Sequence, residues 1–133
     1  MEILFICKAN VGRSQMAEAF FNRMSKRHHA ISAGVNPGSW EGKNLHEFVI
    51  GCMAELGYDL SHSLSKSVTP EMVEKADKII AIMEKSVLPN YIQISQKLLL
   101  WDIKDAGGKD YKFHCRIRDE INVFVERLVQ RIG

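Results

Sequence analysis

Four short runs of apolar residues along the chain have the length of β-strands that are buried on both faces. They are EILFIC at residues 2–7, AISAG at 30–34, KIIAIM at 78–83 and LLLW at 98–101. Short apolar runs that are bounded by polar or turn-forming residues are typical of strands in a parallel sheet. The pattern therefore predicts a sheet built from these four segments.

Between these runs, apolar residues recur at helical spacing. This spacing predicts helices from residue 12 or 13 to about 26, over 45–57, within 67–77 and over 112–132. In the third segment Thr69 is a candidate N-cap and Pro70 a candidate first helical residue. Strands that alternate with helices predict an α/β domain, with helices on both faces of a parallel sheet.

The carboxyl ends of parallel strands mark the edge of such a sheet where ligands bind. The residues that the pattern places at or near this edge are Cys7, Ser32, Met83 and Trp101. Cys7 is the strongest nucleophile among them, and it is followed directly by a polar segment and a helix. The candidate chemistry of the chain is therefore expected around Cys7.

Length and charge narrow the classes of function. The chain has 133 residues and a formal net charge of +2, with 18 basic and 16 acidic residues. We expect one domain over residues 1–133, and the balanced charge gives no electrostatic case for binding nucleic acid or a membrane surface. No apolar run approaches the roughly 20 residues of a transmembrane helix, and MEILFIC lacks the features of a signal peptide.

The cysteines indicate a reducing environment. There are three, Cys7, Cys52 and Cys115, and they are widely spaced without a C-x-x-C pair. An odd number at such spacing argues against a disulfide framework and against a zinc site, so we expect a cytoplasmic protein without a metal. Cys52 and Cys115 fall on predicted helices, where a thiol usually serves as a small buried apolar group.

The segment CKANVGRS, residues 7–14, joins the first strand to the first helix. A loop of this length can curl so that its backbone N–H groups point inward, and the helix adds its own unpaired N–H groups there. Arg13 supplies a planar fork that binds two oxygens of a tetrahedral anion. The sequence therefore predicts a phosphate-binding loop whose members are Lys8, Ala9, Asn10, Val11, Gly12, Arg13 and Ser14.

The same surroundings favour the thiolate form of a cysteine at the start of the loop. A thiolate beneath a bound phosphoryl group is placed for in-line attack on phosphorus, and the Ser14 hydroxyl could support the sulfur. The plainer alternative is that Cys7 is a buried apolar residue and Arg13 a solvated one. The position of the motif between a strand and a helix favours the anion site.

CKANVGRS followed by QMAEAFF resembles the signature of the low-molecular-weight protein tyrosine phosphatases and of the arsenate reductases that share their fold. The resemblance continues through ISAGVNPGSW, LGYDLSHSLSK, ADKIIAIME, WDIKDA and RIRDEINVFVERL. It implies a flavodoxin-like or Rossmann-like three-layer domain with a four-stranded parallel sheet. It also implies a phosphomonoesterase that needs no cofactor and acts through a phosphocysteine.

The resemblance assigns roles to individual residues. It implies that Cys7 is the nucleophile, that Arg13 holds the phosphate, that Ser14 supports the thiolate and that Asp105 is the general acid. A carboxylic acid there could protonate the leaving group, although Asp102 and Asp110 lie in the same loop and are rivals. The implied network that braces the loop consists of Asn10, Ser32 and His62. Trp40 is expected at the mouth of the site, and the other histidines carry no signal.

Three departures from the family pattern affect the reaction. Ala106 stands where the family usually has proline, which predicts a less rigid acid loop. Gly12 stands where many members have a second cysteine, so no disulfide within the loop can protect Cys7. The stretch IIAIMEKSVLPNYIQISQ lacks the two cysteines that arsenate reductases of this fold use to pass a disulfide outward.

The preferred interpretation is therefore a phosphatase that hydrolyses phosphorylated proteins or small phosphate esters and binds phosphate, vanadate or arsenate. Phosphotyrosine and phosphoarginine both remain open as substrates. One alternative is an arsenate reductase that uses an external thiol. The other is a regulatory module that binds oxyanions but turns over poorly.

Overall fold

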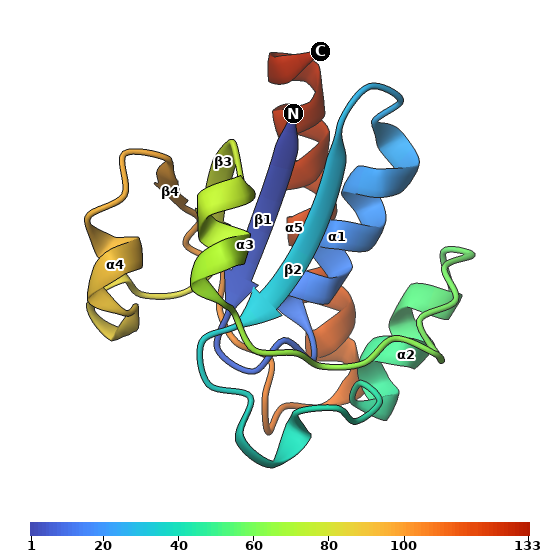
Figure 1. Ribbon diagram of the computed structural model, residues 1–133. Coiled ribbons are helices and arrows are strands. Elements are labelled where there is room, and N and C mark those ends of the chain that lie inside the picture. Colours follow the sequence, from blue (N-terminus) through green and yellow to red (C-terminus); the bar gives the residue numbers. More distant parts are fainter.

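The computed structural model describes residues 1–133, and its four strands form one parallel sheet (Figure 1). The strands are β1 (Glu2–Cys7), β2 (His29–Gly34), β3 (Lys78–Ala81) and β4 (Leu98–Leu100). Their order in the sheet is β2-β1-β3-β4, and all three neighbouring pairs are parallel. The predicted sheet is confirmed, although β3 and β4 end slightly earlier than expected.

The helices are α1 (Arg13–Met24), α2 (Glu47–Ala54), α3 (Pro70–Lys75), α4 (Asn90–Gln93) and α5 (Tyr111–Ile132). Two short 3₁₀ helices, Gly38–Trp40 and Lys85–Val87, lie in the loops after β2 and β3. The predicted start of α3 is confirmed, because the Thr69 hydroxyl accepts a hydrogen bond from the Met72 amide at 3.2 Å. α4 was not predicted, since one helical turn is too short to show a period.

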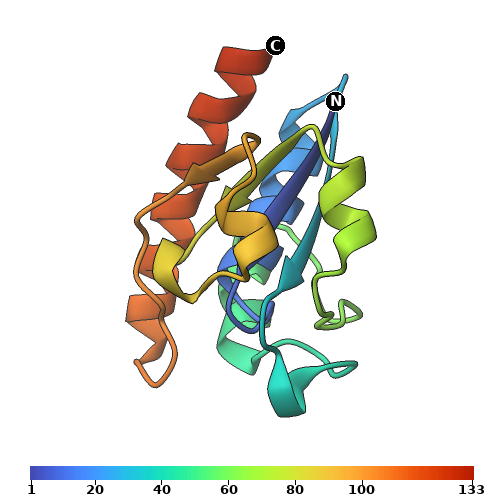
Figure 2. The ribbon, with the colours of Figure 1, turned by 60° about the vertical axis from the view of Figure 1, so that its left-hand side comes forward.

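Alternate residues of β1 enter two separate cores, as expected for a strand in the middle layer. Ile3 and Phe5 pack with residues of α1, α2 and α5, whereas Leu4 and Ile6 pack with residues of α3 and α4. Figures 1 and 2 show these two groups of helices on opposite faces of the sheet. The chain is therefore a three-layer α/β domain, and none of its helices is long and apolar enough to cross a membrane.

The carboxyl ends of β1 and β2 point away from both chain termini (Figure 1). The loop after β1, the 3₁₀ helix Gly38–Trp40 and α2 all lie at this end. The loop from β4 to α5 also returns to it, because α5 begins there. The fold thus brings segments from residues 8, 40 and 105 together.

Candidate active site

The loop between β1 and α1 closes on itself. The Cys7 Sγ atom, at the end of β1, lies 2.9 Å from the Ser14 hydroxyl in the first turn of α1. No backbone N–H group of residues 8–15 donates a hydrogen bond within the chain. Unpaired amides of this kind normally have a partner in folded proteins. A run of them above a cysteine, continuous with a helix N-terminus, is suited to binding an oxyanion.

Asn10 holds the loop in its closed form. Its φ of 59° is in the left-handed region, which asparagine tolerates better than most residues. The buried side chain uses its full capacity: Nδ2 donates to Ser14 Oγ at 2.8 Å and Ser32 Oγ at 3.0 Å. Its Oδ1 accepts from Gln15 Nε2 at 2.9 Å and from the Lys66 amide at 3.0 Å. The Lys66 amide can only donate, so it fixes which end of Asn10 is the oxygen.

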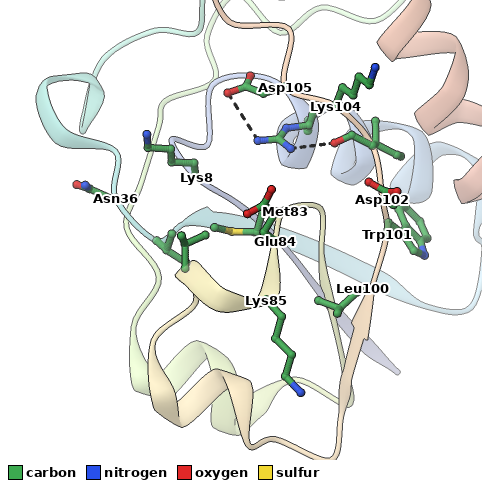
Figure 3. A pocket seen from close by; sticks show the side chains of 14 residues that line it. Lys8, Asn36, Met83, Glu84, Lys85, Leu100, Trp101, Asp102, Lys104 and Asp105 are labelled. Carbon is green, nitrogen blue, oxygen red and sulfur yellow. Dashed lines mark hydrogen bonds and ion pairs between the residues drawn. The ribbon is translucent and has the colours of Figure 1, made fainter.

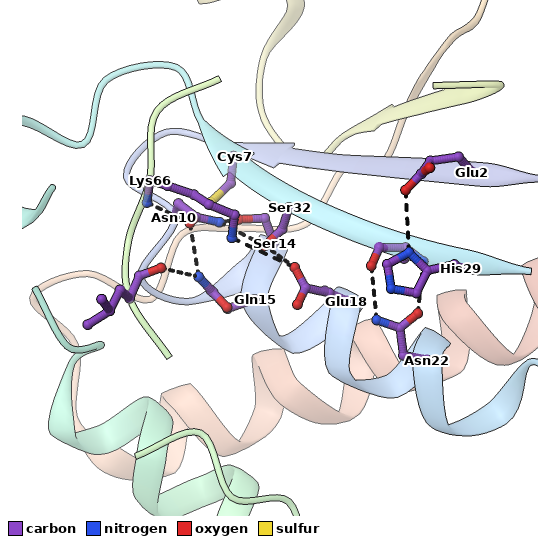
Figure 4. A network of polar contacts seen from close by, with 12 residues as sticks. Glu2, Cys7, Asn10, Ser14, Gln15, Glu18, Asn22, His29, Ser32 and Lys66 are labelled. Carbon is purple, nitrogen blue, oxygen red and sulfur yellow. Dashed lines mark hydrogen bonds and ion pairs between the residues drawn. The ribbon is translucent and has the colours of Figure 1, made fainter. Parts of the chain in front are cut away.

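The network has a direction that ends at the sulfur (Figure 4). The Ser32 hydroxyl donates to Glu18 Oε1 at 2.7 Å, so its oxygen is free to accept from Asn10. Asn10 in turn donates to Ser14 Oγ, which leaves the hydroxyl proton of Ser14 for Cys7. The Glu18 carboxylate, at one end of this chain of hydrogen bonds, therefore orients the Ser14 hydroxyl at the other end so that it donates to the Cys7 sulfur.

His62 does not join this network, in contrast to what the family resemblance implied. Its side chain is exposed and forms no hydrogen bond to Asn10 or Ser32. The Asp59–Ser61 turn carries the segment outward, where Ser61 N–H donates to Asp59 at 2.9 Å. The chain reaches the loop only further along, where the Ser65 hydroxyl donates to the Ala9 carbonyl at 2.6 Å.

β2 can approach the loop because it ends in glycine. A Cβ atom added at Gly34 would lie 2.7 Å from the Lys8 carbonyl oxygen, closer than side chains come to backbone. The amides of Val35 and Asn36 donate to the carbonyls of Cys7 and Lys8 at 3.0 and 2.8 Å. These two hydrogen bonds direct the carbonyls of Cys7 and Lys8 toward the end of β2. The N–H groups of the loop are therefore not used in pairing with β2.

Arg13 connects the loop to the segment that carries Asp105. Its Nη1 donates to the Ile103 carbonyl at 3.0 Å, and Nη2 lies 3.8 Å from Asp105 Oδ2 (Figure 3). Asp105 also accepts a hydrogen bond from the Gly107 amide at 2.9 Å. Ile103 and Ala106, on either side of Asp105, are buried in the core. Two apolar side chains therefore hold the segment while the carboxylate between them stays exposed.

The rival aspartates lie in different places. Asp110 is the N-cap of α5 and accepts a hydrogen bond from the Phe113 amide at 2.9 Å, which is a structural role. Asp102 is exposed and does not line the cavity that contains Cys7. Asp105 does line that cavity, together with Arg13 and Trp40. The geometry therefore favours Asp105 among the three.

Two adjoining cavities surround these groups. The smaller, of about 410 Å³, contains Cys7 and the loop, with Trp40 on its wall. The larger, of about 930 Å³, extends from Arg13 along the ends of β3 and β4. Asp105 lines both cavities. A group bound above Cys7 can therefore extend past Asp105 in either direction.

Two histidines that carried no sequence signal lie in the wall of the smaller cavity. The rings of His46 and His114 stack with their centroids 5.4 Å apart and their planes 14° apart. Burial and the neighbouring His46 lower the pKa of His114 below its usual value. His46 caps α2 by accepting from the Phe48 amide at 3.0 Å. The two come from different elements, so no local pattern could reveal the pair.

The remaining cysteines lie apart from the site. Burial, with the Cys115 thiol nearby, raises the pKa of Cys52 to about 11. Neither residue lines the cavities that adjoin Cys7, and all three cysteines are free. The structure contains no cluster of three or more His, Cys, Asp or Glu side chains that could hold a metal ion.

Residues 2–133 match the family described as low molecular weight phosphotyrosine protein phosphatase, and the chain belongs to this family. Cysteine-based catalysis is a property of the family. The match spans nearly the whole chain and agrees with the fold.

Individual relatives carry different activities. Arsenate reductase 1 of Staphylococcus epidermidis is 31% identical over 136 residues, covering 98% of this chain and 96% of the relative. Among solved structures, a YwlE arginine phosphatase mutant with a phosphorylated active-site serine has a TM-score of 0.88 and 26% identity, covering 99% of this chain and 95% of that one. An arsenate reductase in its phosphate-binding state has a TM-score of 0.84 and 25% identity, covering 99% and 98%.

Proposed function

We propose that this protein is a phosphomonoester hydrolase that acts through a phosphocysteine on Cys7. The observation that carries the proposal is the closed loop, several of whose unpaired amides belong to residues that line, with Arg13, the cavity containing the sulfur. This arrangement can bind the three non-bridging oxygens of a phosphoryl group and stabilise the charge that develops on them.

In the first half of the reaction, the Cys7 thiolate attacks phosphorus and an S–P bond forms. The bond from phosphorus to the leaving oxygen breaks, and protonated Asp105 gives its proton to that oxygen. In the second half, the Asp105 carboxylate takes a proton from water, which attacks phosphorus. The S–P bond then breaks, phosphate leaves and the thiolate returns, with Ser14 donating a hydrogen bond to the sulfur.

Hydrolysis is preferred over arsenate reduction because the chain offers no second thiol to Cys7. In arsenate reduction, Cys7 would first form an S–As bond with arsenate, and a second thiol would then have to attack this sulfur, so that a disulfide forms, the S–As bond breaks and arsenite leaves. Cys52 is buried, and the raised pKa of its thiol disfavours the reactive thiolate. Arsenate reduction with an external thiol is the second candidate, favoured by the similarity to the staphylococcal arsenate reductase.

The substrate is proposed at the level of its chemistry. The family's description favours phosphotyrosine, whereas the likeness to the YwlE arginine phosphatase favours phosphoarginine. Both present a phosphoryl group on a protein side chain, but phosphorus is bonded to oxygen in phosphotyrosine and to nitrogen in phosphoarginine, where Asp105 would protonate the leaving nitrogen instead. We propose a phosphorylated protein as the substrate and an aryl phosphate as the simplest probe of the reaction.

The test is hydrolysis of 4-nitrophenyl phosphate by wild-type protein and by Cys7→Ser, with vanadate as inhibitor and without added metal. We expect Cys7→Ser to lower kcat by about 10⁴-fold or more while phosphate binding remains. Cys115→Ser is the matched control, because this partly exposed thiol lies outside both cavities, and it should keep full activity.

Three results would contradict the proposal. If wild-type protein leaves the aryl phosphate intact but consumes an added thiol when given arsenate, it is a reductase. If it binds phosphate without either activity, it is an oxyanion-binding module. If Cys7→Ser and Cys115→Ser behave alike, Cys7 is not the nucleophile.

A further inference from the structure

The larger cavity is continuous with the proposed phosphate site. It shares Lys8, Arg13, Asn36 and Asp105 with the smaller cavity that contains Cys7. Its volume of about 930 Å³ exceeds what an isolated phosphate ester would fill. Nothing in the proposed reaction on a small ester uses this space.

Some of the apolar side chains that line this cavity are exposed and lie outside both cores. Figure 3 shows Met83 and Leu100 facing the hollow from the ends of β3 and β4. Leu100 is 44% exposed, and Val87, which also lines the cavity, is 59% exposed. Neither belongs to the two hydrophobic cores. Apolar residues that gather in an exposed hollow usually mark a surface that another molecule covers.

Charges of both signs surround the apolar lining. Lys8, Lys85 and Lys104 line the cavity with Glu84 and Asp102, and none of these five forms an ion pair in the structure. A rim of uniform positive charge would suit nucleic acid or an anionic membrane. An apolar surface surrounded by unpaired charges of both signs suits a polypeptide, because a polypeptide presents apolar side chains and polar backbone groups together.

We propose that this cavity is a subsite for protein substrates, where an apolar side chain next to the phosphorylated residue binds against Leu100, Met83 and Val87. The proposal rests on the proposed function, because the phosphoryl group must lie above Cys7. An extended chain advances about 3.3 Å per residue, so the three residues on either side of the phosphorylated one reach about 10 Å from it, and the test covers these positions.

A series of phosphotyrosine peptides tests this subsite. Each peptide has a Gly/Ser background and one leucine, which moves from three residues before the phosphotyrosine to three residues after it. We expect kcat/KM of the wild-type protein to rise about tenfold for one position of leucine, since an apolar side chain then leaves water. 4-Nitrophenyl phosphate is assayed in parallel to report on the reaction alone.

Two neighbouring leucines of β4, the strand at the edge of the sheet, provide a test variant and a matched control. Leu99 and Leu100 are adjacent and similarly exposed, at 42% and 44%, but they point to opposite faces of the sheet. Only Leu100 lines the cavity. We expect Leu100→Ser to remove the tenfold preference for the leucine peptide and to leave hydrolysis of 4-nitrophenyl phosphate unchanged. Leu99→Ser should change neither.

The outcomes separate this inference from the proposed function. If 4-nitrophenyl phosphate is hydrolysed but no leucine position is preferred, the subsite is refuted and the proposed function stands. Equal effects of Leu99→Ser and Leu100→Ser also refute it. If Leu100→Ser turns a dimeric protein into a monomer, a second copy covers the cavity and the inference fails. Failure of wild-type protein to hydrolyse 4-nitrophenyl phosphate refutes both.

Discussion

The segment of residues 8–15, which is the loop after β1 with the first residues of α1, meets the loop of residues 102–110 at the same site, but the two are held in opposite ways. In the first, Asn10 is fully buried and makes four hydrogen bonds. In the second, the side chain of Asp105 is 64% exposed and has one ion pair, at 3.8 Å, and one hydrogen bond to a neighbouring amide. One loop is braced by side chains from several elements, and the other is anchored mainly at its buried apolar residues.

The difference in how firmly the two loops are held agrees with their proposed roles in the reaction. Groups that bind a developing charge are most effective when they are fixed in advance, so that no energy is lost in reorganising them. In the proposed reaction the general acid must reach a leaving group and later a water molecule, and Asp105, proposed for this role, lies beside two cavities. We therefore expect damage to the first loop to affect stability and activity together, and damage to the second to affect activity alone.

Among the changes that compare the two loops, the largest effect is expected from Asn10→Ala. The change leaves the Lys66 amide and the Gln15 side chain without their acceptor, and it places alanine at a φ of 59°. The free energy of unfolding should fall by about 3 kcal/mol, measured by urea denaturation. kcat/KM should fall about 100-fold or more. Asn36→Ala is the control: this exposed side chain forms no hydrogen bond, and stability should stay within about 0.5 kcal/mol.

Asp105→Asn is the complementary change in the other loop. kcat should fall by about 10²-fold, and more for esters with poor leaving groups than for those with good ones, because poor leaving groups need the proton. The free energy of unfolding should stay within about 0.5 kcal/mol of wild type. Asp102→Asn, in the same loop, should keep kcat within about twofold. A larger effect at Asp102 than at Asp105 would reverse the assignment.

A smaller effect is expected on the pH dependence of stability, through His114 in the wall of the smaller cavity. The pKa of His114 is lowered in the folded protein, chiefly by burial, so the unfolded chain takes up the proton at a higher pH. Stability should therefore decrease as the pH falls below about 6.5 toward the folded pKa, and this part of the decrease should be absent from His114→Gln. Urea denaturation at pH 7.5 and 5.5 measures it. Identical pH dependence in both proteins would contradict the expectation.

The smallest effect is expected from Ala106→Pro, which would restore the residue usual in the family pattern. The Ala106 amide donates no hydrogen bond within the chain, so proline removes none. Stability should rise by about 0.4–1 kcal/mol because the unfolded chain loses freedom. A loss of more than 1 kcal/mol would show that the backbone at this position cannot accept proline.

Local patterns predicted most of the fold and the centre of the site. The four strands were marked by apolar runs, and the order strand, C-x5-R, helix placed Cys7 and Arg13 at the carboxyl edge of the sheet. The close approach of Cys7 to Ser14 follows from the same local geometry. These features depend on residues that are near one another in sequence, which is why the sequence alone indicated them.

What the sequence did not indicate depends on contacts between distant segments. Glu18 ends the network because it lies one turn of α1 beyond Ser14 and faces Ser32 on β2. The segment around Lys66 supplies the contact that was expected from His62, since the chain turns outward before it. The histidine pair and the larger cavity likewise arise only when separate elements pack together.

In the proposed reaction, the amides of residues 8–15 and Arg13 form an oxyanion site above Cys7. Titration of ¹⁵N-labelled wild-type protein with inorganic phosphate tests it directly through the backbone amide resonances. The largest shifts should fall on residues 8–15, and the side-chain resonances of Arg13 should move with them. Saturating phosphate that leaves these amides unchanged, or that shifts amides elsewhere in the chain, would contradict the account.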